Sequence, residues 1–196
     1  MTRGRLEAFS DGVIAILITI MVLELKVPQG VDATTLRPMI PTLLSYLLSF
    51  VFLAIYWNNH HHLLQTTQQV DGRVLWANMN LLFWLSLIPV VTAWMGRSHG
   101  AALPVAIYGA VLILAGIAFT ILVRALVALH GPESLVAKAI GQDVKGKVSL
   151  LLYAVAIPLA FVRVWIAAAL YVTVAIIWLV PDPRMERALS GSRVIE

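Results

Sequence analysis

The residues of this sequence that could do chemistry are polar side chains inside or beside long apolar stretches. They occur near the start or end of four such stretches, which is an unusual place for serine, aspartate, asparagine, histidine and arginine. A polar or charged group in an apolar medium is costly unless a partner satisfies it, so each is a candidate for a functional or structural site. The candidates are Ser10, Asp11, Asn58, Asn59, His60, His61, His62, Asn78, Asn80 and Arg124.

The three consecutive histidines suggest a metal or haem site, but their spacing argues against it. Adjacent residues on a regular helix point about 100° apart, so His60, His61 and His62 cannot all bind one ion. The sequence has no cysteine, which excludes thiolate metal sites and iron–sulfur clusters. We therefore expect no bound metal and no cofactor. The role of the three histidines stays open, and pH sensing by them has no other support in the sequence.

The composition determines which elements must position these residues. Hydrophobic residues make up 60% of the 196 residues and charged residues 12%, and the mean hydropathy is +0.89. Soluble domains contain roughly 45–50% apolar and about 25% charged residues. The net charge of +4 comes from lysines and arginines that lie singly between apolar blocks. This pattern favours an all-α membrane protein and argues against a nucleic-acid partner.

Apolar blocks long enough to cross a bilayer predict six transmembrane helices in one domain, residues 1–196. The last two blocks are separated only by Arg163, so one kinked or re-entrant segment with its bend at Pro158 is the alternative, which would leave five spans. The first block is expected to be retained as a helix rather than cleaved as a signal. The predicted spans are approximately residues 9–25, 40–59, 74–95, 103–126, 148–161 and 164–180.

The distribution of lysine and arginine predicts the orientation of these spans. Cations near span ends favour the cytoplasmic side. In the six-span arrangement one side has only Lys26, Arg37, Arg97 and Arg163, and both termini fall on the other. We therefore predict a multi-pass protein of the cell membrane with both termini in the cytoplasm. The cations on the cytoplasmic side are Arg3, Arg5, Arg73, Arg124, Lys138, Lys145, Lys147, Arg184, Arg187 and Arg193.

With this topology the polar candidates gather in one layer near the cytoplasmic ends of four helices. Asp11 would accept hydrogen bonds there from a histidine, an asparagine or a cation, and the layer would hold the helix ends together. In the alternative interpretation, Ser10 or Asp11 caps the first helix, and the histidines face headgroups and water.

The first predicted helix also carries an uncharged stripe. On a helical wheel Gly12, Ile16, Ile20, Leu23 and Val27 share one narrow face, with Thr19 at its edge. Periodicity does not decide whether this face contacts lipid, a neighbouring helix or a pore.

The same segment carries a recognisable motif. Arg5, Phe9, Ser10 and Asp11 form RxxxFSD, followed by the sequence GVIAI and ending in LELKVP. This resembles the first helix of the TMEM175 potassium-channel family, in particular its short bacterial members with one six-helix unit per subunit. Tyr56-Trp57 and the Asn80-Leu81-Leu82 segment before Pro89 support the resemblance. Beyond about residue 100 the likeness is one of hydropathy only.

The resemblance implies a homotetramer in which the first helices surround a central potassium pathway without a TVGYG filter. It implies that Ile16, Ile20 and Leu23 form an apolar constriction, and that Thr19 takes part in potassium selectivity. Arg5 joins the polar network in such relatives. On this basis we expect a channel with membrane lipids as its other partners, not an enzyme, and with potassium only as the permeating ion. The network residues are then Arg5, Ser10, Asp11, Asn58, His61, His62, Asn78, Asn80 and Arg124.

Two other classes of function stay open at this stage. Asp11 and the histidines of the second span could form the proton relay of a proton-coupled secondary transporter, although the sequence shows no inverted repeat. A membrane enzyme with a histidine-based site is the third class, and it lacks a second acidic cluster at the same depth.

Overall fold

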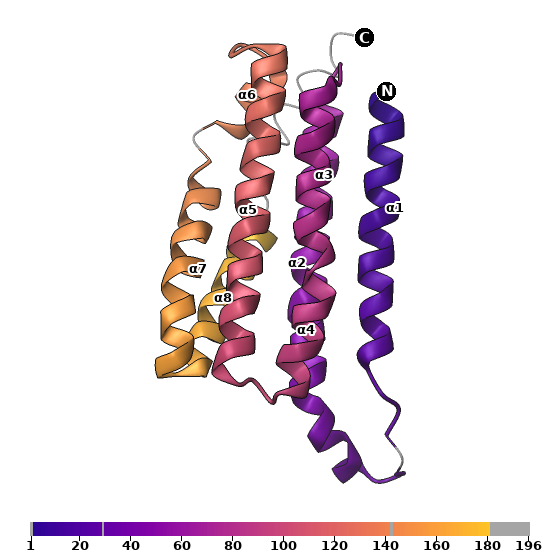
Figure 1. Cartoon of the computed structure of the whole chain (residues 1–196), viewed down its shortest axis with the longest axis vertical. Helices are drawn as coiled ribbons and strands as arrows, with labels where there is room; N and C mark the ends of the chain where they lie inside the picture. Colours follow the sequence, from indigo (N-terminus) through magenta and orange to yellow (C-terminus); the bar gives the residue numbers. More distant parts are fainter. Residues whose placement is uncertain (1, 29, 142, 181–196) are drawn as a thin grey trace.

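The computed structural model describes residues 2–28, 30–141 and 143–180, which form an all-helical bundle (Figure 1). Two 3-10 helices, η1 (Val22–Glu24) and η2 (Ala33–Met39), extend or precede longer helices near one end. The α-helices are α1 (Arg3–Met21), α2 (Ile40–Gln65), α3 (Gly72–Ser86), α4 (Ile88–Arg97), α5 (Ala102–His130), α6 (Leu135–Ile140), α7 (Val144–Val162) and α8 (Val164–Leu179).

Several of these elements are long and apolar enough to cross a bilayer. Five stretches meet both conditions in the described chain: Arg3–Glu24, Ala33–Gln65, Gly72–Arg97, Ala102–His130 and Val144–Val162. α8 is equally apolar but has only 16 residues. Helices are what such sequences must form in lipid, because every backbone amide and carbonyl then finds a partner within its own segment. The chain is therefore a multi-pass membrane protein.

Two prolines have different effects on their helices. Pro89 follows a break at Leu87 that separates α3 from α4 within one span, which fits a residue that removes one backbone hydrogen bond and crowds the preceding turn. Pro158 lies inside α7 without ending it. The chain instead reverses at Arg163, whose backbone is extended (φ −152°, ψ 105°), so residues 144–179 form two helices rather than one bent segment.

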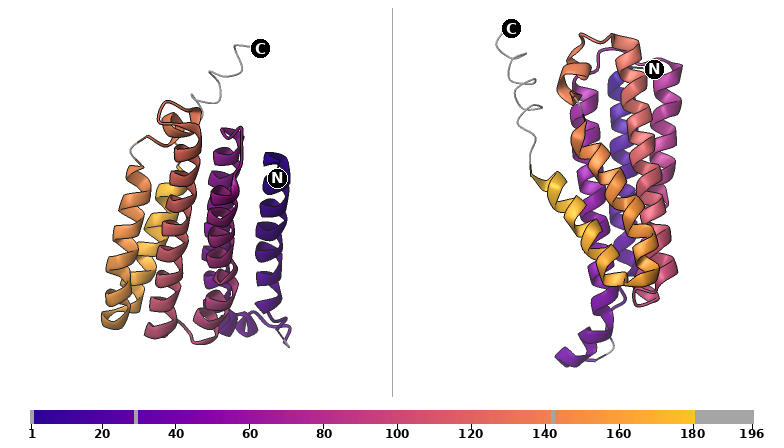
Figure 2. Two further views of the ribbon diagram at one scale, coloured as in Figure 1. Left: turned by 45° about the horizontal axis from the view of Figure 1, so that its top comes forward. Right: turned by 90° about the vertical axis from the view of Figure 1, so that its left-hand side faces the viewer.

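The helices are arranged with α1 at one edge of the bundle and the α7–α8 hairpin at the opposite edge (Figures 1 and 2). α5 packs against both α3 and α7, and so connects the two halves of the bundle. We call the end of the bundle that contains Arg3, Arg73 and Lys147 the basic end. The arginines at 184, 187 and 193, which the orientation prediction also uses, lie outside the described residues.

Small residues and buried hydroxyls allow the helices to approach closely. A β-carbon on Gly96 of α4 would lie 2.9 Å from the α-carbon of Thr42, so α4 and α2 are nearly in backbone contact. The buried Ser49 hydroxyl lies 2.6 Å from Thr92 and 3.0 Å from the Tyr108 hydroxyl, linking α2 to α4 and α5. Such contacts are typical of membrane bundles, in which close packing and interhelical hydrogen bonds replace a hydrophobic driving force.

Candidate functional site

α1 has one packed face and one exposed face. Its buried residues, spaced three or four apart, point toward α2, α3 and α4, and they are Leu6, Ser10, Ile14, Leu17 and Met21. The opposite face carries Ile16 and Ile20 and continues into Leu23 of η1, and these side chains are 59%, 41% and 77% exposed in the single subunit. The uncharged stripe of the sequence is therefore the face of α1 that no other described helix covers.

Thr19 lies on the exposed side of α1, next to this stripe. Its hydroxyl donates a hydrogen bond to the Ile16 carbonyl one turn earlier, at 2.9 Å. Because the hydroxyl hydrogen is used within the helix, the lone pairs of the oxygen point away from it. Thr19 thus offers an oxygen ligand on a surface that is otherwise made of hydrocarbon.

A buried polar chain joins three helices toward the basic end. The Asn78 amide of α3 donates to the Ser10 hydroxyl at 2.9 Å, and Ser10 in turn donates to the Leu6 carbonyl at 2.9 Å. On its other side the Asn78 carbonyl oxygen lies 2.7 Å from the ring nitrogen Nε2 of His60 on α2. Ser10, His60 and Asn78 are all fully buried, so this chain links α1, α2 and α3 where water cannot compete.

A second, more accessible group of contacts lies beside this chain. The indole of Trp57 donates to the Asp11 carboxylate at 3.0 Å. Glu7 lies one turn before Asp11, with its carboxylate 3.2 Å from Nδ1 of His61 and 3.7 Å from the Arg3 guanidinium. The Trp57 and His61 rings stack with centroids 5.7 Å apart. These contacts join α1 to α2.

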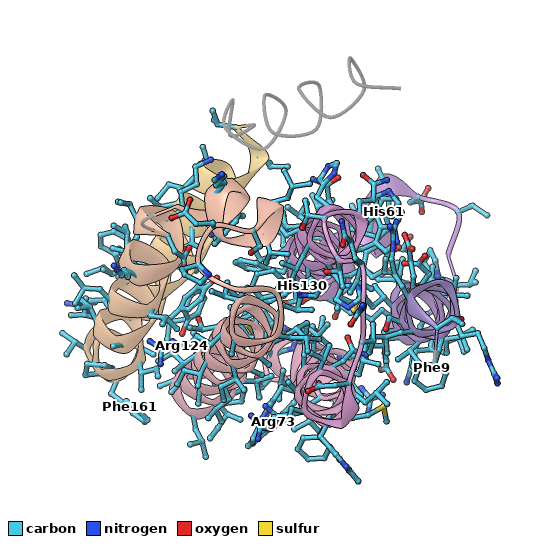
Figure 3. All side chains as sticks on the ribbon, turned by 90° about the horizontal axis from the view of Figure 1, so that it is seen from above. Phe9, His61, Arg73, Arg124, His130 and Phe161 are labelled. Carbon is cyan, nitrogen blue, oxygen red and sulfur yellow. The ribbon has the colours of Figure 1, made fainter. Side chains whose placement is uncertain are left out.

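Several residues predicted for the network are placed elsewhere. Arg5 and Asn58 are exposed, and Asn80 is half-buried. Among the described residues, none of these three side chains makes a hydrogen bond or ion pair. His62 is half-buried, with its ring 5.7 Å from that of His61. Arg124 lies on α5, across the bundle from His61 (Figure 3). The network of α1, α2 and α3 therefore does not include it.

The predicted network left out three participants, Glu7, Trp57 and His60, although His60 was among the polar candidates of the sequence. The signal for Glu7 was present, because Arg3, Glu7 and Asp11 are spaced four residues apart and so share one face of a helix. Which of three adjacent histidines points inward depends on how α2 is rotated, and that rotation is set by its neighbours rather than by its own sequence.

One group of side chains has ligand types that metals use. Donor atoms of Glu7, Asp11 and His61 all lie within 4.8 Å of one another. Each residue also has a protein partner already, since Trp57 binds Asp11, Arg3 pairs with Glu7, and Gln65 binds His61 at 2.8 Å. These contacts account for the group without an ion.

The far end of α1 is held by a different contact. Glu24, in the 3-10 turn that follows α1, forms an ion pair with Arg97 at the end of α4. Both side chains are partly exposed, so the pair contributes little to stability by itself. It joins η1, which continues α1, to α4 at the end opposite the polar chain. α1 is therefore held to the rest of the subunit by polar contacts at both ends and by apolar packing between them.

The chain is similar to known proteins over its first half and, for some relatives, over most of its length. The sequence profile of a family described as endosomal/lysosomal potassium channel TMEM175 matches residues 5–89, which include α1, α2, α3 and the beginning of α4. A protein named as a potassium channel from Chryseobacterium sp. (strain P1-3) is 52% identical over 189 residues, covering 96% of this chain and 98% of that protein.

A second relative connects the sequence to a solved structure from the same organism. A protein named as a potassium channel from Chamaesiphon minutus is 31% identical over 187 residues, covering 88% of this chain and 91% of that protein. The crystal structure of a lysosomal potassium-selective channel TMEM175 homolog from Chamaesiphon minutus superposes with a TM-score of 0.78 and 30% identity, covering 90% of this chain and 96% of that one.

Proposed function

The chain belongs to the TMEM175 family of channels, and from that premise we propose that it forms a homotetrameric, potassium-permeable channel with α1 around the central axis. The relatives named as potassium channels support the choice of ion. In this proposal the subunit crosses the membrane six times, α8 being the sixth span. The basic end and both termini are cytoplasmic.

The observation that carries the proposal is the exposed apolar face of α1. Ile16, Ile20 and Leu23 are large, uncovered and spaced by four and three residues, so they form three successive levels on one side of the helix. Four copies that turned this face toward a shared axis would surround a narrow pore with three rings of apolar side chains.

A pore constriction of this kind conducts ions when water fills it and is closed when water leaves it. Hydrocarbon rings gate by dewetting, so small rotations of the four α1 helices would open or close the pathway without moving a charge through the membrane. The site needs no cofactor and no reacting group. Its function is passage of an ion, not catalysis.

Potassium selectivity requires oxygen ligands, which the isoleucine and leucine rings do not supply. In this proposal Thr19 supplies them, because its hydroxyl hydrogen is bound to the Ile16 carbonyl and its lone pairs are left for a cation. A rotation of α1 that moved Ile20 off the axis would bring Thr19 toward it, since the two positions differ by about 100° around the helix.

The first test changes the wettability of the constriction. Ile16→Asn places an amide in the first ring, so we expect potassium flux into proteoliposomes to increase, or its preference over sodium to fall. Ile176→Asn on α8 is the matched control, because that isoleucine is 56% exposed and lies on a helix away from α1. Unchanged flux for Ile16→Asn, or an equal change for both variants, would contradict the assignment.

The same assay separates a channel from a proton-coupled transporter that uses Asp11 and the histidines. Channel flux should rise in proportion to the potassium gradient and continue when the proton gradient is abolished. Flux that saturates and stops without a proton gradient would favour the transporter.

A further inference from the structure

Arg124 takes no part in the polar network at α1. The surroundings of its side chain indicate a different role. Arg124 is exposed on α5, on the side that faces α7 (Figure 3). Within the part of the chain that the structure describes, its guanidinium makes no ion pair and no hydrogen bond. An arginine on the outer surface of a membrane helix is costly unless an anion or water satisfies it.

The depth of Arg124 places it at a membrane interface. It lies about 22 residues after the start of α5 at Ala102, or roughly 33 Å at 1.5 Å per residue. The hydrocarbon core of a bilayer is about 30 Å thick. If the outer end of α5 begins near one headgroup layer, Arg124 therefore reaches the other, at the level of the lipid phosphates.

Arg124 also lines a groove of about 550 Å³ between α5, α6 and α7. Lys147, in the first turn of α7, lines the same groove, and neither cation has an ion-pair partner among the described residues. The walls also include apolar side chains: Val123 and Leu150 lie on the membrane side of the two cations, and Val127 lies about one turn farther toward the basic end. The groove thus combines two cations with a hydrocarbon surface, which is the pattern expected where a lipid headgroup and the start of its acyl chain bind together.

The remaining charged residues nearby limit the kind of headgroup. Asp143, before α7, is the one acidic residue in the lining of this groove, and with Arg124 and Lys147 it leaves a net charge of one positive unit. Lys145 is directed elsewhere, since it donates to the Val180 carbonyl at 2.7 Å and lies over the Trp178 ring. Lys138 pairs with Glu133 at 3.7 Å. One uncompensated cation matches one phosphodiester.

We propose that the groove between α5, α6 and α7 is a binding site for an anionic phospholipid, whose phosphate lies between Arg124 and Lys147 and whose acyl chain follows α5 and α7. Phosphatidylglycerol fits, because its headgroup has a phosphate and no cation of its own. The inference rests on the membrane orientation of the proposed function, but it does not require α1 to form the pore.

Native mass spectrometry of the purified protein, titrated with single lipids, tests this site. Phosphatidylglycerol should bind in preference to phosphatidylcholine and phosphatidylethanolamine. Each cation near an anionic lipid contributes enough that its removal lowers affinity about fivefold, so Arg124→Gln and Lys147→Gln should each weaken phosphatidylglycerol binding by that factor and the double variant by more. Lys138→Gln, a cation at the same end but paired with Glu133, is the matched control and should bind lipid as the parent does.

Three outcomes would overturn the proposal. The first is equal binding of the three lipids, and the second is an equal loss of binding in Lys138→Gln. The third is displacement of phosphatidylglycerol by millimolar inorganic phosphate, which would show that the groove recognises free phosphate rather than a lipid. Melting temperatures of all variants establish that the exposed substitutions leave the fold intact. Potassium flux is measured in a separate experiment. The lipid-binding result can therefore be interpreted even if the channel proposal fails.

Discussion

Asn78 of α3 links the buried polar groups of α1 and α2. Its amide donates to Ser10 and its carbonyl oxygen meets His60, so one side chain satisfies buried polar groups on two other helices. Ser10 and Asn78 are identifiable from the sequence because polar residues are rare at that depth. The choice of His60 over its two neighbours is not, because it depends on how α2 is rotated against α3.

Asn78→Ala should therefore destabilise the subunit. The variant leaves the His60 ring nitrogen buried without its partner, which costs about 1–3 kcal/mol. It also removes the hydrogen bond that the Ser10 oxygen accepts, although Ser10 still donates to the Leu6 carbonyl, so we expect a total loss of about 2–4 kcal/mol. Asn80→Ala is the control two residues away, since the half-buried Asn80 side chain has no hydrogen bond within the described chain. Its effect should stay within about 0.5 kcal/mol. The free energy of unfolding is measured by chemical or thermal unfolding. An equal loss in the two variants would show that the hydrogen bonds of Asn78 do not stabilise the subunit.

Asp143 gives a prediction about pH. Burial raises the pKa of its carboxyl above the usual 3.8, against the opposing effects of the Gly146 amide and Lys147. Because the folded pKa is the higher one, this group favours folding while it is protonated, and that contribution is lost as pH rises from 3.8 through the raised pKa.

Asp143 is the N-cap residue of α7, and its side chain accepts a hydrogen bond from the Gly146 amide. Asp143→Asn removes the charge but keeps this hydrogen bond, because the asparagine side-chain oxygen also accepts. Asparagine also tolerates the positive φ of 45° at this position. We expect a higher melting temperature than the parent at neutral pH, and no difference below pH 3.8. A stabilisation that persisted unchanged in acid would rule out the charge as its cause.

At the scale of elements, the packing of α4 against α2 depends on a missing side chain. A β-carbon on Gly96 would meet the backbone of Thr42 at 2.9 Å, and backbone atoms cannot move aside as a flexible side chain can. Gly96→Ala should therefore separate the two helices and cost about 1–3 kcal/mol. Gly72→Ala is the control, because nothing lies within 4 Å of that position. Similar melting temperatures for both variants would contradict the close approach.

The helices themselves could be predicted well from the sequence, because a run of apolar residues in lipid has almost no alternative to a helix. The ends were less predictable. α2 continues through the three histidines to Gln65, six residues beyond the predicted end of its span, and α7 begins at Val144 rather than near 148. Hydropathy marks where the lipid ends, whereas a helix ends where its backbone finds other partners.

At the scale of the whole molecule, the proposed assembly of four copies makes a specific prediction about α1. The chain has no cysteine, so Leu23→Cys introduces a single thiol on its exposed face. If the α1 helices meet at the axis, mild oxidation should join neighbouring copies, because a disulfide needs α-carbons within about 7 Å. Leu179→Cys, on α8, is the matched control, since that leucine is also well exposed and its helix lies away from α1.

Cross-linking of Leu179→Cys alone would place the contact at the other edge of the subunit. No cross-link in either variant, with a monomeric mass in native mass spectrometry, would refute the assembly. The apolar stripe in the sequence identified this face of α1. The stripe could not show whether the face contacts lipid, a neighbouring helix or a pore, because all three produce the same periodic pattern. Only the other helices, by covering the opposite face, show which side of α1 the subunit leaves to the outside.

The exposed face of α1 also has a consequence for how the protein is made. Ile16, Ile20 and Leu23 are as compatible with acyl chains as with one another, so a newly inserted subunit is already solvated by the bilayer before it meets another copy. In the proposed oligomer, assembly is then a two-dimensional search by lateral diffusion. The fraction of complete oligomers, and with it the proposed ion flux, should depend on the surface density of subunits.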